Sequence, residues 1–181
     1  MRKLTHEEIS SRRTPPDAAG TMKRHPIIGL LDNIRSLYNV GSIFRTSDGG
    51  SIQELFLCGY TPHPPRKEIE KTALGSTRTV PWRPFRSSLD GIAAARDAGF
   101  RICVLEQTTE SRLCSQVTPA DFPVCLVVGN EITGVAAGVI AAADMAVEIP
   151  MFGTKQSLNA SVAYGIALFG LISVLTDHMQ E

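Results

Sequence analysis

Three polar stretches of the sequence interrupt apolar runs, and their residue types could bind a ligand or assist a reaction. The stretch 150–159 places Gly, Thr, Lys, Gln, Ser and Asn between a strand-like apolar run and an apolar C-terminal run. Ser157 or Asn159 can cap the helix that follows, but capping uses one such residue and leaves the others without a structural task. The surplus of hydrogen-bonding groups therefore predicts a ligand-binding loop, and a turn satisfied by ordered water is the alternative.

The second stretch is VVGNEITGV, residues 127–135. Its two glycines have the spacing of a phosphate-binding loop, but that loop requires Lys at the position of Val135. A nucleoside triphosphate site is therefore not expected. A nucleotide-dependent oxidoreductase would need Gly-x-Gly-x-x-Gly after a strand, and the sequence lacks it. The stretch predicts a tight turn with Glu131 at its centre and Gly134 giving backbone freedom, in which Glu131 either caps the turn or contacts a ligand.

The third stretch, residues 33–49, holds Asn39 and Ser42, which are residue types that cap helices. Arg45 follows Asn39 by six residues and so lies more than one turn inside the expected helix. An Arg in that position is a surface salt-bridge partner, or it binds a phosphate with two parallel hydrogen bonds. Both interpretations are open from the residues alone.

Strand-like and helix-like runs alternate along the chain after an N-terminal arm or linker, residues 1–24. Strands are expected at 26–32, 53–59, 101–107, 123–129 and 145–150, and helices at 39–48, 66–74, 87–99, 134–144 and from about 159. This alternation predicts an α/β fold for residues 25–181, with a parallel sheet and helices on both faces. Ligands of such sheets bind at the carboxyl ends of the strands, where all three polar stretches lie.

Composition and charge narrow the function classes. A chain of 181 residues with 43% hydrophobic residues is one globular domain in size. Residues 1–90 hold 14 basic and 9 acidic side chains, whereas residues 91–181 hold 4 basic and 9 acidic ones. The basic excess of the first half is either a solvated face or a surface for a polyanion such as RNA. The apolar run 160–175 is too short to span a bilayer. Four cysteines without a metal-ligand pattern, and no cleavable leader, predict a reduced cytoplasmic protein that binds no metal and no membrane.

Taken together, the three stretches resemble a known family. They read N-(x5)-N-x-G-(x3)-R-T at 33–46, V-x-G-N-E-(x2)-G-V at 127–135 and I-P-M-x-G-(x3)-S-L-N-x-S at 149–161. These are similar to motifs 1, 2 and 3 of the SpoU/TrmH group of SPOUT RNA 2′-O-ribose methyltransferases, over about residues 26–176. We call them the first, second and third motif.

The resemblance implies an α/β knot, in which the C-terminal segment forms a deep trefoil, and a homodimer with its site near the interface. It implies S-adenosylmethionine as the methyl donor, S-adenosylhomocysteine as the product, and tRNA or rRNA as the substrate. The cofactor contacts carried over by position are Leu105, Gln107, Val128, Gly129, Glu131, Ile149, Met151, Ser157, Leu158 and Asn159. Arg45 matches the residue that activates the ribose hydroxyl, with Asn39, Glu131, Ser157 and Asn159 around it.

Two departures from the family pattern bear on these expectations. Ile132 stands where the family often has Gly, and the chain has a short arm where many members have an RNA-binding domain. RNA recognition is therefore expected from the arm, the dimer surface and the basic segment 63–86, with Arg66, Lys67, Lys71, Arg78, Arg83 and Arg86. A catalytically silent RNA-binding protein that retains the fold is the alternative function.

Overall fold

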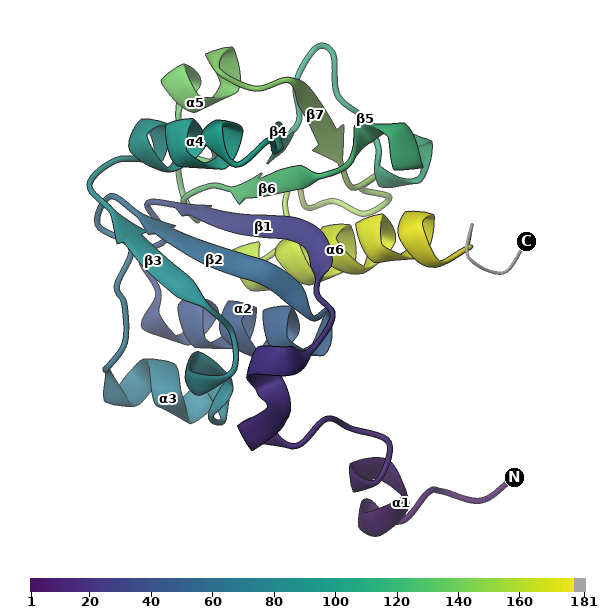
Figure 1. The fold of residues 1–181 in the computed structure, drawn as a ribbon. Coiled ribbons are helices and arrows are strands. Elements are labelled where there is room, and N and C mark those ends of the chain that lie inside the picture. The colour runs from purple at the N-terminus through teal and green to yellow at the C-terminus, as the bar shows by residue number, and fades with distance from the viewer. Residues whose placement is uncertain (178–181) are drawn as a thin grey trace.

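A computed structural model describes residues 1–177 and contains one parallel sheet. Its strand order is β3-β2-β1-β6-β4-β7-β5, and every pair of neighbours runs in the same direction. The strands are β1 (His25–Asp32), β2 (Ile52–Cys58), β3 (Trp82–Phe85), β4 (Arg101–Leu105), β5 (Arg112–Leu113), β6 (Val124–Val128) and β7 (Met145–Glu148). Figure 1 shows how the strands fan across the middle of the molecule.

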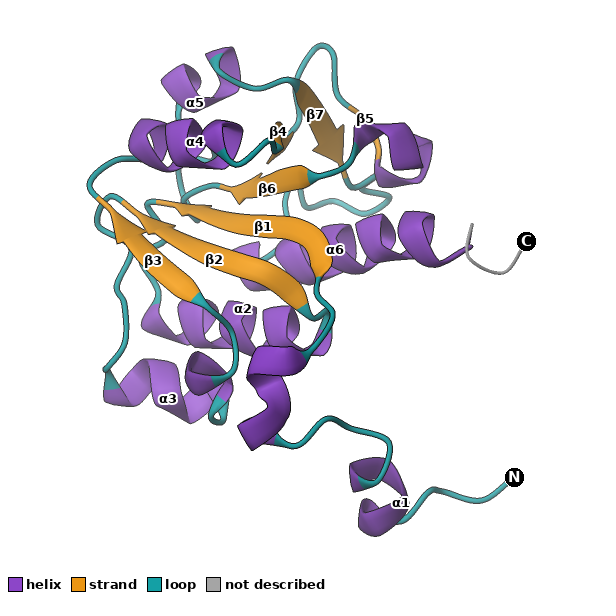
Figure 2. Ribbon diagram, viewed as in Figure 1, coloured by secondary structure: helices purple, strands orange, loops and turns teal. Residues whose placement is uncertain are grey.

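Helices cover both faces of the sheet (Figure 2). On one face lie α2 (Leu37–Gly49), α3 (Lys67–Ala73) and α6 (Ala160–Asp177), and on the other lie α4 (Ser88–Asp97) and α5 (Ala137–Ala141). Short 3₁₀ turns occur at Pro16–Thr21, Ser76–Arg78, Cys114–Gln116 and Pro119–Asp121. The helix α1 (His6–Ser10) belongs to an N-terminal segment that projects from the sheet and its helices (Figure 1).

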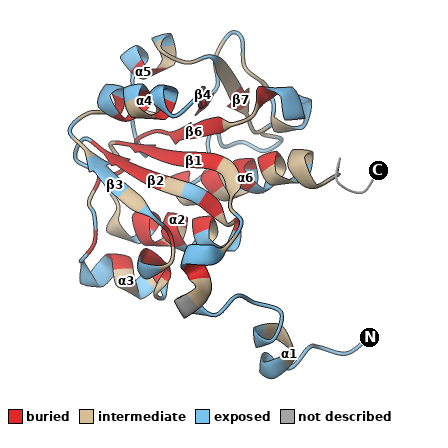
Figure 3. Cartoon of the chain, in the orientation of Figure 1, coloured by how far each residue is buried: buried red, intermediate tan, exposed pale blue. Residues whose placement is uncertain are grey.

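The hydrophobic core consists of two layers, one on each face of the sheet. Side chains of α2, α3 and α6 pack on one layer, and side chains of α4 and α5 pack on the other. The central strand β6 is buried along its whole length, as an unbroken apolar run in a parallel sheet requires (Figure 3). Burial raises the pKa of the Cys58 and Cys103 thiols to about 12, so these side chains remain protonated and act as small apolar groups.

The C-terminal helix α6 is fastened to the sheet and to α2 by Tyr164. Its hydroxyl shares a buried hydrogen bond of 2.8 Å with the Ser47 hydroxyl of α2. Gly29 of β1 leaves the space for this ring, since a Cβ there would lie 2.6 Å from the Tyr164 oxygen. Gly29 and Ser47 thus leave the space in which Tyr164 of α6 packs against β1 and α2.

The five strands and the helices that the sequence predicts are present, with shifted ends. The helix expected at 134–144 begins at Ala137, because Gly134 and Val135 belong to the loop before it. The strands β3 and β5 were not predicted, since they are short, half exposed and lie at the sheet edges. Within residues 1–177, no helix is long and apolar enough to cross a membrane.

Candidate functional site

The second motif folds into a closed turn directly after β6. Backbone groups of Asn130 and Gly134 pair in both directions at 3.0 and 2.9 Å. The Asn130 side-chain oxygen accepts the backbone N–H groups of Ile132 and Thr133. Gly129 is packed so closely that a Cβ would lie 2.2 Å from the backbone of Gly134. The close approach of the two backbone segments therefore requires glycine at position 129.

Glu131 joins this turn to the first motif. Its carboxylate accepts the backbone N–H groups of Arg35 and Ser36 at 2.9 and 3.0 Å and the Asn39 side-chain amide at 2.9 Å. Partial burial alone would raise the pKa of Glu131, but these three donors outweigh it and hold the pKa below its usual value. Glu131 is thus an ionised acceptor that positions the first motif.

Two further carboxylates hold the far end of the turn. Asp32, at the end of β1, is almost fully buried and accepts the backbone N–H of Ala136 at 2.9 Å and the Ser88 hydroxyl. Glu106, just after β4, accepts the backbone N–H of Val135 at 3.0 Å. The second motif, which follows β6, is therefore fastened to the ends of β1 and β4.

The third motif is connected through Asn159 and Gln107. Asn159 caps α6 by accepting the backbone N–H of Ser161 at 2.9 Å, and its amide donates to the Asn39 side-chain oxygen at 3.1 Å. Gln107 donates to the backbone carbonyl of Gln156 at 2.7 Å. A chain of hydrogen bonds thus runs from Glu131 through Asn39 to Asn159 and links all three motifs.

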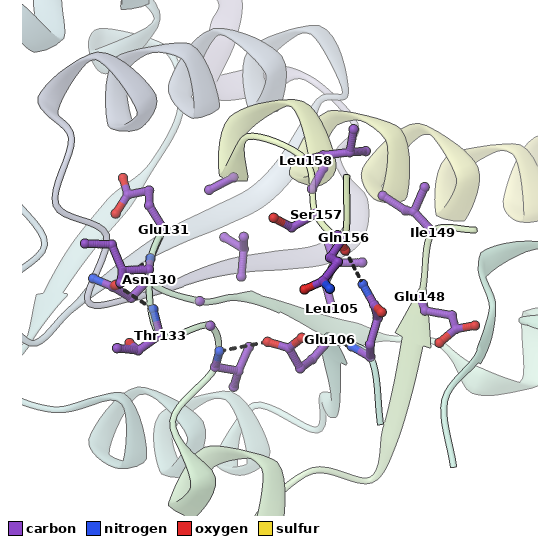
Figure 4. A pocket seen from close by; sticks show the side chains of 18 of the residues that line it. Leu105, Glu106, Asn130, Glu131, Thr133, Glu148, Ile149, Gln156, Ser157 and Leu158 are labelled. Atoms are coloured by element: carbon purple, nitrogen blue, oxygen red, sulfur yellow. Dashed lines mark hydrogen bonds between the residues drawn. The ribbon is translucent and has the colours of Figure 1, made fainter. Parts of the chain in front are cut away.

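A cavity of about 550 Å³ lies between the second motif, the end of β4 and the third motif. Figure 4 shows Asn130, Glu131 and Thr133 on one side of it and Glu148 and Ile149 on the opposite side. Apolar walls come from Leu105, Val128, Val135, Ile140, Ile149, Met151 and Leu158. Among the described residues that line the cavity are three glutamates and no Lys, Arg or His. Such a cavity suits a neutral or cationic ligand better than a phosphate.

Most of the predicted cofactor contacts line this cavity. They are Leu105, Gln107, Val128, Gly129, Glu131, Ile149, Met151, Ser157 and Leu158. Asn159 and Asn39 are not among the lining residues, but they are joined to each other, and Asn39 donates to the lining residue Glu131. Arg45 is different, since it is exposed on α2 and does not line the cavity.

The expected N-terminal cap of α2 needs correction. Ser36, and not Asn39 or Ser42, caps α2, because its hydroxyl accepts the backbone N–H of Asn39 at 3.3 Å. The side chain of Asn39 is thereby free to join Glu131 and Asn159.

Sequence reasoning missed several residues of the site, above all Glu106 and Asn130. The signal was present for Asn130, which stands inside the second motif. For Glu106 the signal was its place after an apolar strand, between Leu105 and Gln107, which were both predicted. Thr133, Gly134, Glu148 and Gln156 also line the cavity.

Comparison with known proteins agrees with this arrangement. A model of the SpoU rRNA Methylase family matches residues 26–169. A tRNA (guanosine(18)-2'-O)-methyltransferase of Aquifex aeolicus is 32% identical over 148 residues, which are 81% of this chain and 69% of the relative. A 23S rRNA (guanosine-2'-O-)-methyltransferase of Neisseria meningitidis is 28% identical over 154 residues, which are 84% of this chain and 60% of the relative.

A solved structure, an AdoMet-bound rRNA methyltransferase from Sinorhizobium meliloti, resembles the fold with a TM-score of 0.75. It is 28% identical, and the match covers 88% of this chain and 60% of that one. The predicted fold class is confirmed: a parallel α/β sheet with helices on both faces, of the α/β-knot type. The chain spans about 60% to 70% of the length of these relatives.

Proposed function

Because the chain belongs to the SpoU rRNA methylase family, we propose that it transfers a methyl group from S-adenosylmethionine to a ribose 2′-hydroxyl of tRNA or rRNA. The observation that carries this proposal is the convergence of the second and third motifs on one cavity, with the first motif fastened to both. The relatives named above act on guanosine in tRNA and in 23S rRNA, which supports RNA as the substrate class.

The cavity suits the proposed cofactor in size and in chemistry. About 550 Å³ lies within the usual range for small-molecule sites, and apolar walls beside backbone groups are what an adenosine requires. The three lining glutamates favour a positively charged ligand, and S-adenosylmethionine supplies a sulfonium methyl group for in-line displacement. We propose that the cavity-lining residues predicted from the motifs are the cofactor contacts.

The proposed reaction needs a group that orients the ribose and a path for its proton. Glu131 is occupied by three donors and its lowered pKa makes it a weak base, so we assign it a positioning role. Arg45 is exposed on α2, where incoming RNA can reach it. It either activates the hydroxyl or holds the adjacent phosphate, and a guanidinium is a poor base at neutral pH.

Methyl-transfer assays and mass-spectrometric mapping of ribose methylation test this function. Purified protein should transfer label from S-adenosylmethionine to total RNA from cells that lack the protein. The variant Arg45→Lys keeps the charge and loses the planar fork, so we expect most of the turnover to be lost. No transfer by the wild-type protein to any RNA, together with retained RNA binding, would favour the catalytically silent alternative.

We propose a homodimer that uses the exposed apolar face of α6. Val162, Ile166 and Phe169 are each about half exposed and recur at helical spacing on one side of that helix. Gly49 of α2 lies next to Phe169, and Arg45 is one helical turn from Gly49, so a partner there would stand close to Arg45. Sedimentation should show a dimer, and Phe169→Glu should shift it to a monomer.

We propose that RNA is held by the arm, residues 1–24, and by the exposed cations of segment 63–86, while residues 25–181 form the methyltransferase domain. Arg83 is set apart from these cations, because its guanidinium is bound to Glu54 at 2.7 and 3.0 Å. The remaining cations of that segment are Arg66, Lys67, Lys71, Arg78 and Arg86, all of them exposed. The proposed compartment is the cytoplasm, where tRNA and rRNA are present.

A further inference from the structure

Tyr60 stands out on the surface beside the first and second motifs. It follows β2, and 61% of the residue is exposed although its polar groups are bonded. Its hydroxyl accepts the Asn130 side-chain amide at 2.8 Å, and its backbone N–H donates to the Asn33 side-chain oxygen at 3.2 Å. The ring is thus fixed at two points and still faces solvent.

The backbone next to Tyr60 is arranged to bring it to the motifs. Gly59 has a φ of +64°, and a Cβ there would lie 2.0 Å from the Asn33 side-chain oxygen. Asn130, which holds the Tyr60 hydroxyl, also donates to the backbone carbonyl of Asn33 at 2.8 Å. Because Asn130 precedes Glu131, the aromatic ring is connected directly to the turn that forms one wall of the cofactor cavity.

A second, smaller cleft of about 250 Å³ lies beside Tyr60. Gly59, Asn33 and Arg86 are among the residues that line it. The backbone N–H of Gly59 donates to the carbonyl of Phe85 at 3.1 Å, so the chain at Tyr60 is next to the chain at Arg86. Arg86 is exposed and makes no ion pair within the residues that the structure describes.

An oriented aromatic ring with a nearby unpaired guanidinium is an arrangement that binds a nucleotide in a single strand. Any base can stack on an aromatic side chain, and an Arg can bind the phosphate that joins neighbouring nucleotides. We propose that Tyr60 stacks on a base of the RNA next to the methylated nucleotide and that Arg86 binds the adjoining phosphate. This inference rests on the proposed function and names the contact that positions its substrate.

The variants Tyr60→Phe and Tyr60→Ala separate stacking from structure. Both remove the hydrogen bond to Asn130, but only Tyr60→Ala removes the ring. The probe is total RNA from cells that lack the protein, with KM, kcat and filter binding measured for each variant. We expect Tyr60→Ala to raise the KM and the Kd for RNA at least about fivefold, with Tyr60→Phe within about twofold of wild type. Affinity for S-adenosylhomocysteine and the melting temperature check that the turn is intact.

Arg83, three residues before Arg86, is a matched control because it is already paired with Glu54. Arg86→Gln should weaken RNA binding and lower the slope of log Kd against log salt by about one, as loss of one phosphate contact does. Arg83→Gln should leave that slope unchanged.

Three results would overturn the inference. Equal loss in Tyr60→Phe and Tyr60→Ala would show that the hydrogen bond to Asn130 matters and the ring does not. If Tyr60→Ala keeps the KM and Kd of the wild-type protein, no base stacks on Tyr60. If Arg86→Gln leaves the salt slope unchanged, Arg86 does not bind a phosphate. If the wild-type protein transfers no methyl group, the proposed function fails, and filter binding of the same RNA still decides the stacking contact.

Discussion

The two loops that face each other across the cavity differ in how they are held. The loop of the second motif, residues 129–135, is closed by its own backbone and fastened by Asp32, Glu106 and Glu131 to three other segments. The loop of the third motif, residues 150–158, is exposed along most of its length. Within residues 1–177, a single hydrogen bond, from Gln107 to Gln156, joins it to the rest of the chain.

We therefore expect the two loops to contribute differently to ligand binding. We call the loop of the second motif the fixed wall of the cavity and the loop of the third motif the adaptable wall. The loop of the second motif is already held by its own hydrogen bonds, so we expect its contacts with a ligand to cost little conformational entropy. Within the described part of the chain, the side chains of Thr154, Lys155, Gln156 and Ser157 make no hydrogen bond, and ordering them has a cost that contacts with a ligand must offset. The surplus of hydrogen-bonding groups in that loop therefore fits a segment that becomes ordered around a bound molecule.

A pair of glycine substitutions should expose this difference most strongly. Gly129→Ala would place a Cβ 2.2 Å from the Gly134 backbone, so the fixed turn must open. Gly153 in the other loop has no atom within 4 Å of the corresponding position. We expect Gly129→Ala to lower the affinity for S-adenosylhomocysteine more than about a hundredfold and Gly153→Ala less than about twofold. Calorimetric titration measures both, and equal losses would contradict the division into fixed and adaptable walls.

Glu131→Gln tests the connection between the second and first motifs. The amide keeps one acceptor oxygen, and its NH₂ group then faces either the Arg35 N–H or the Ser36 N–H together with the Asn39 amide. Loss of hydrogen bonds to a charged group should lower the free energy of unfolding by about 1 to 3 kcal/mol and reduce kcat/KM for methyl transfer roughly tenfold to a hundredfold. Glu110→Gln, which removes an exposed carboxylate outside the cavity, is the matched control and should behave as wild type.

Gln107→Ala should act on the adaptable loop alone. It removes the bond to the Gln156 carbonyl, so residues 150–158 should exchange their amide hydrogens faster in the absence of ligand. We expect about threefold to tenfold weaker binding of S-adenosylhomocysteine and little change in melting temperature. Gln107→Glu keeps the size of the side chain but cannot donate to the carbonyl, and it should show the same faster exchange. A large fall in melting temperature with unchanged exchange would refute this assignment.

The sequence predicts more of the fold than of the candidate site. Apolar runs such as 123–129 mark buried parallel strands, and their alternation with helical segments gives the layers. The short edge strands β3 and β5 give no such signal, because they bury few side chains and are defined by pairing with a neighbour.

Motif positions predicted which residues line the cavity, but they could not predict the connections between them. Glu131 and Asn39 are 92 residues apart, and their contact depends on β1 and β6 being neighbours in the sheet. The hydrogen bond from the backbone N–H of Val135 to Glu106 likewise depends on the pairing of β4 with β6. The exposure of Arg45 agrees with its expected place on the surface of α2, but the sequence does not tell whether it meets an acidic side chain or a phosphate.

Low pH should slightly destabilise the loop of the second motif through protonation of Glu131. The loop of the third motif, residues 150–158, contains no carboxylate and should not show this effect. The folded-state pKa of Glu131 lies below the ordinary value of about 4.3, so its contribution to stability is complete above that ordinary value. The contribution is lost as the pH falls through the lowered folded-state pKa, when the carboxylate takes up a proton. Urea unfolding of wild type and Glu131→Gln between pH 8 and pH 3 should therefore show a constant difference in free energy down to about pH 5 and a shrinking one below it. A difference that already declines between pH 7 and pH 6 would mean that another group controls the turn.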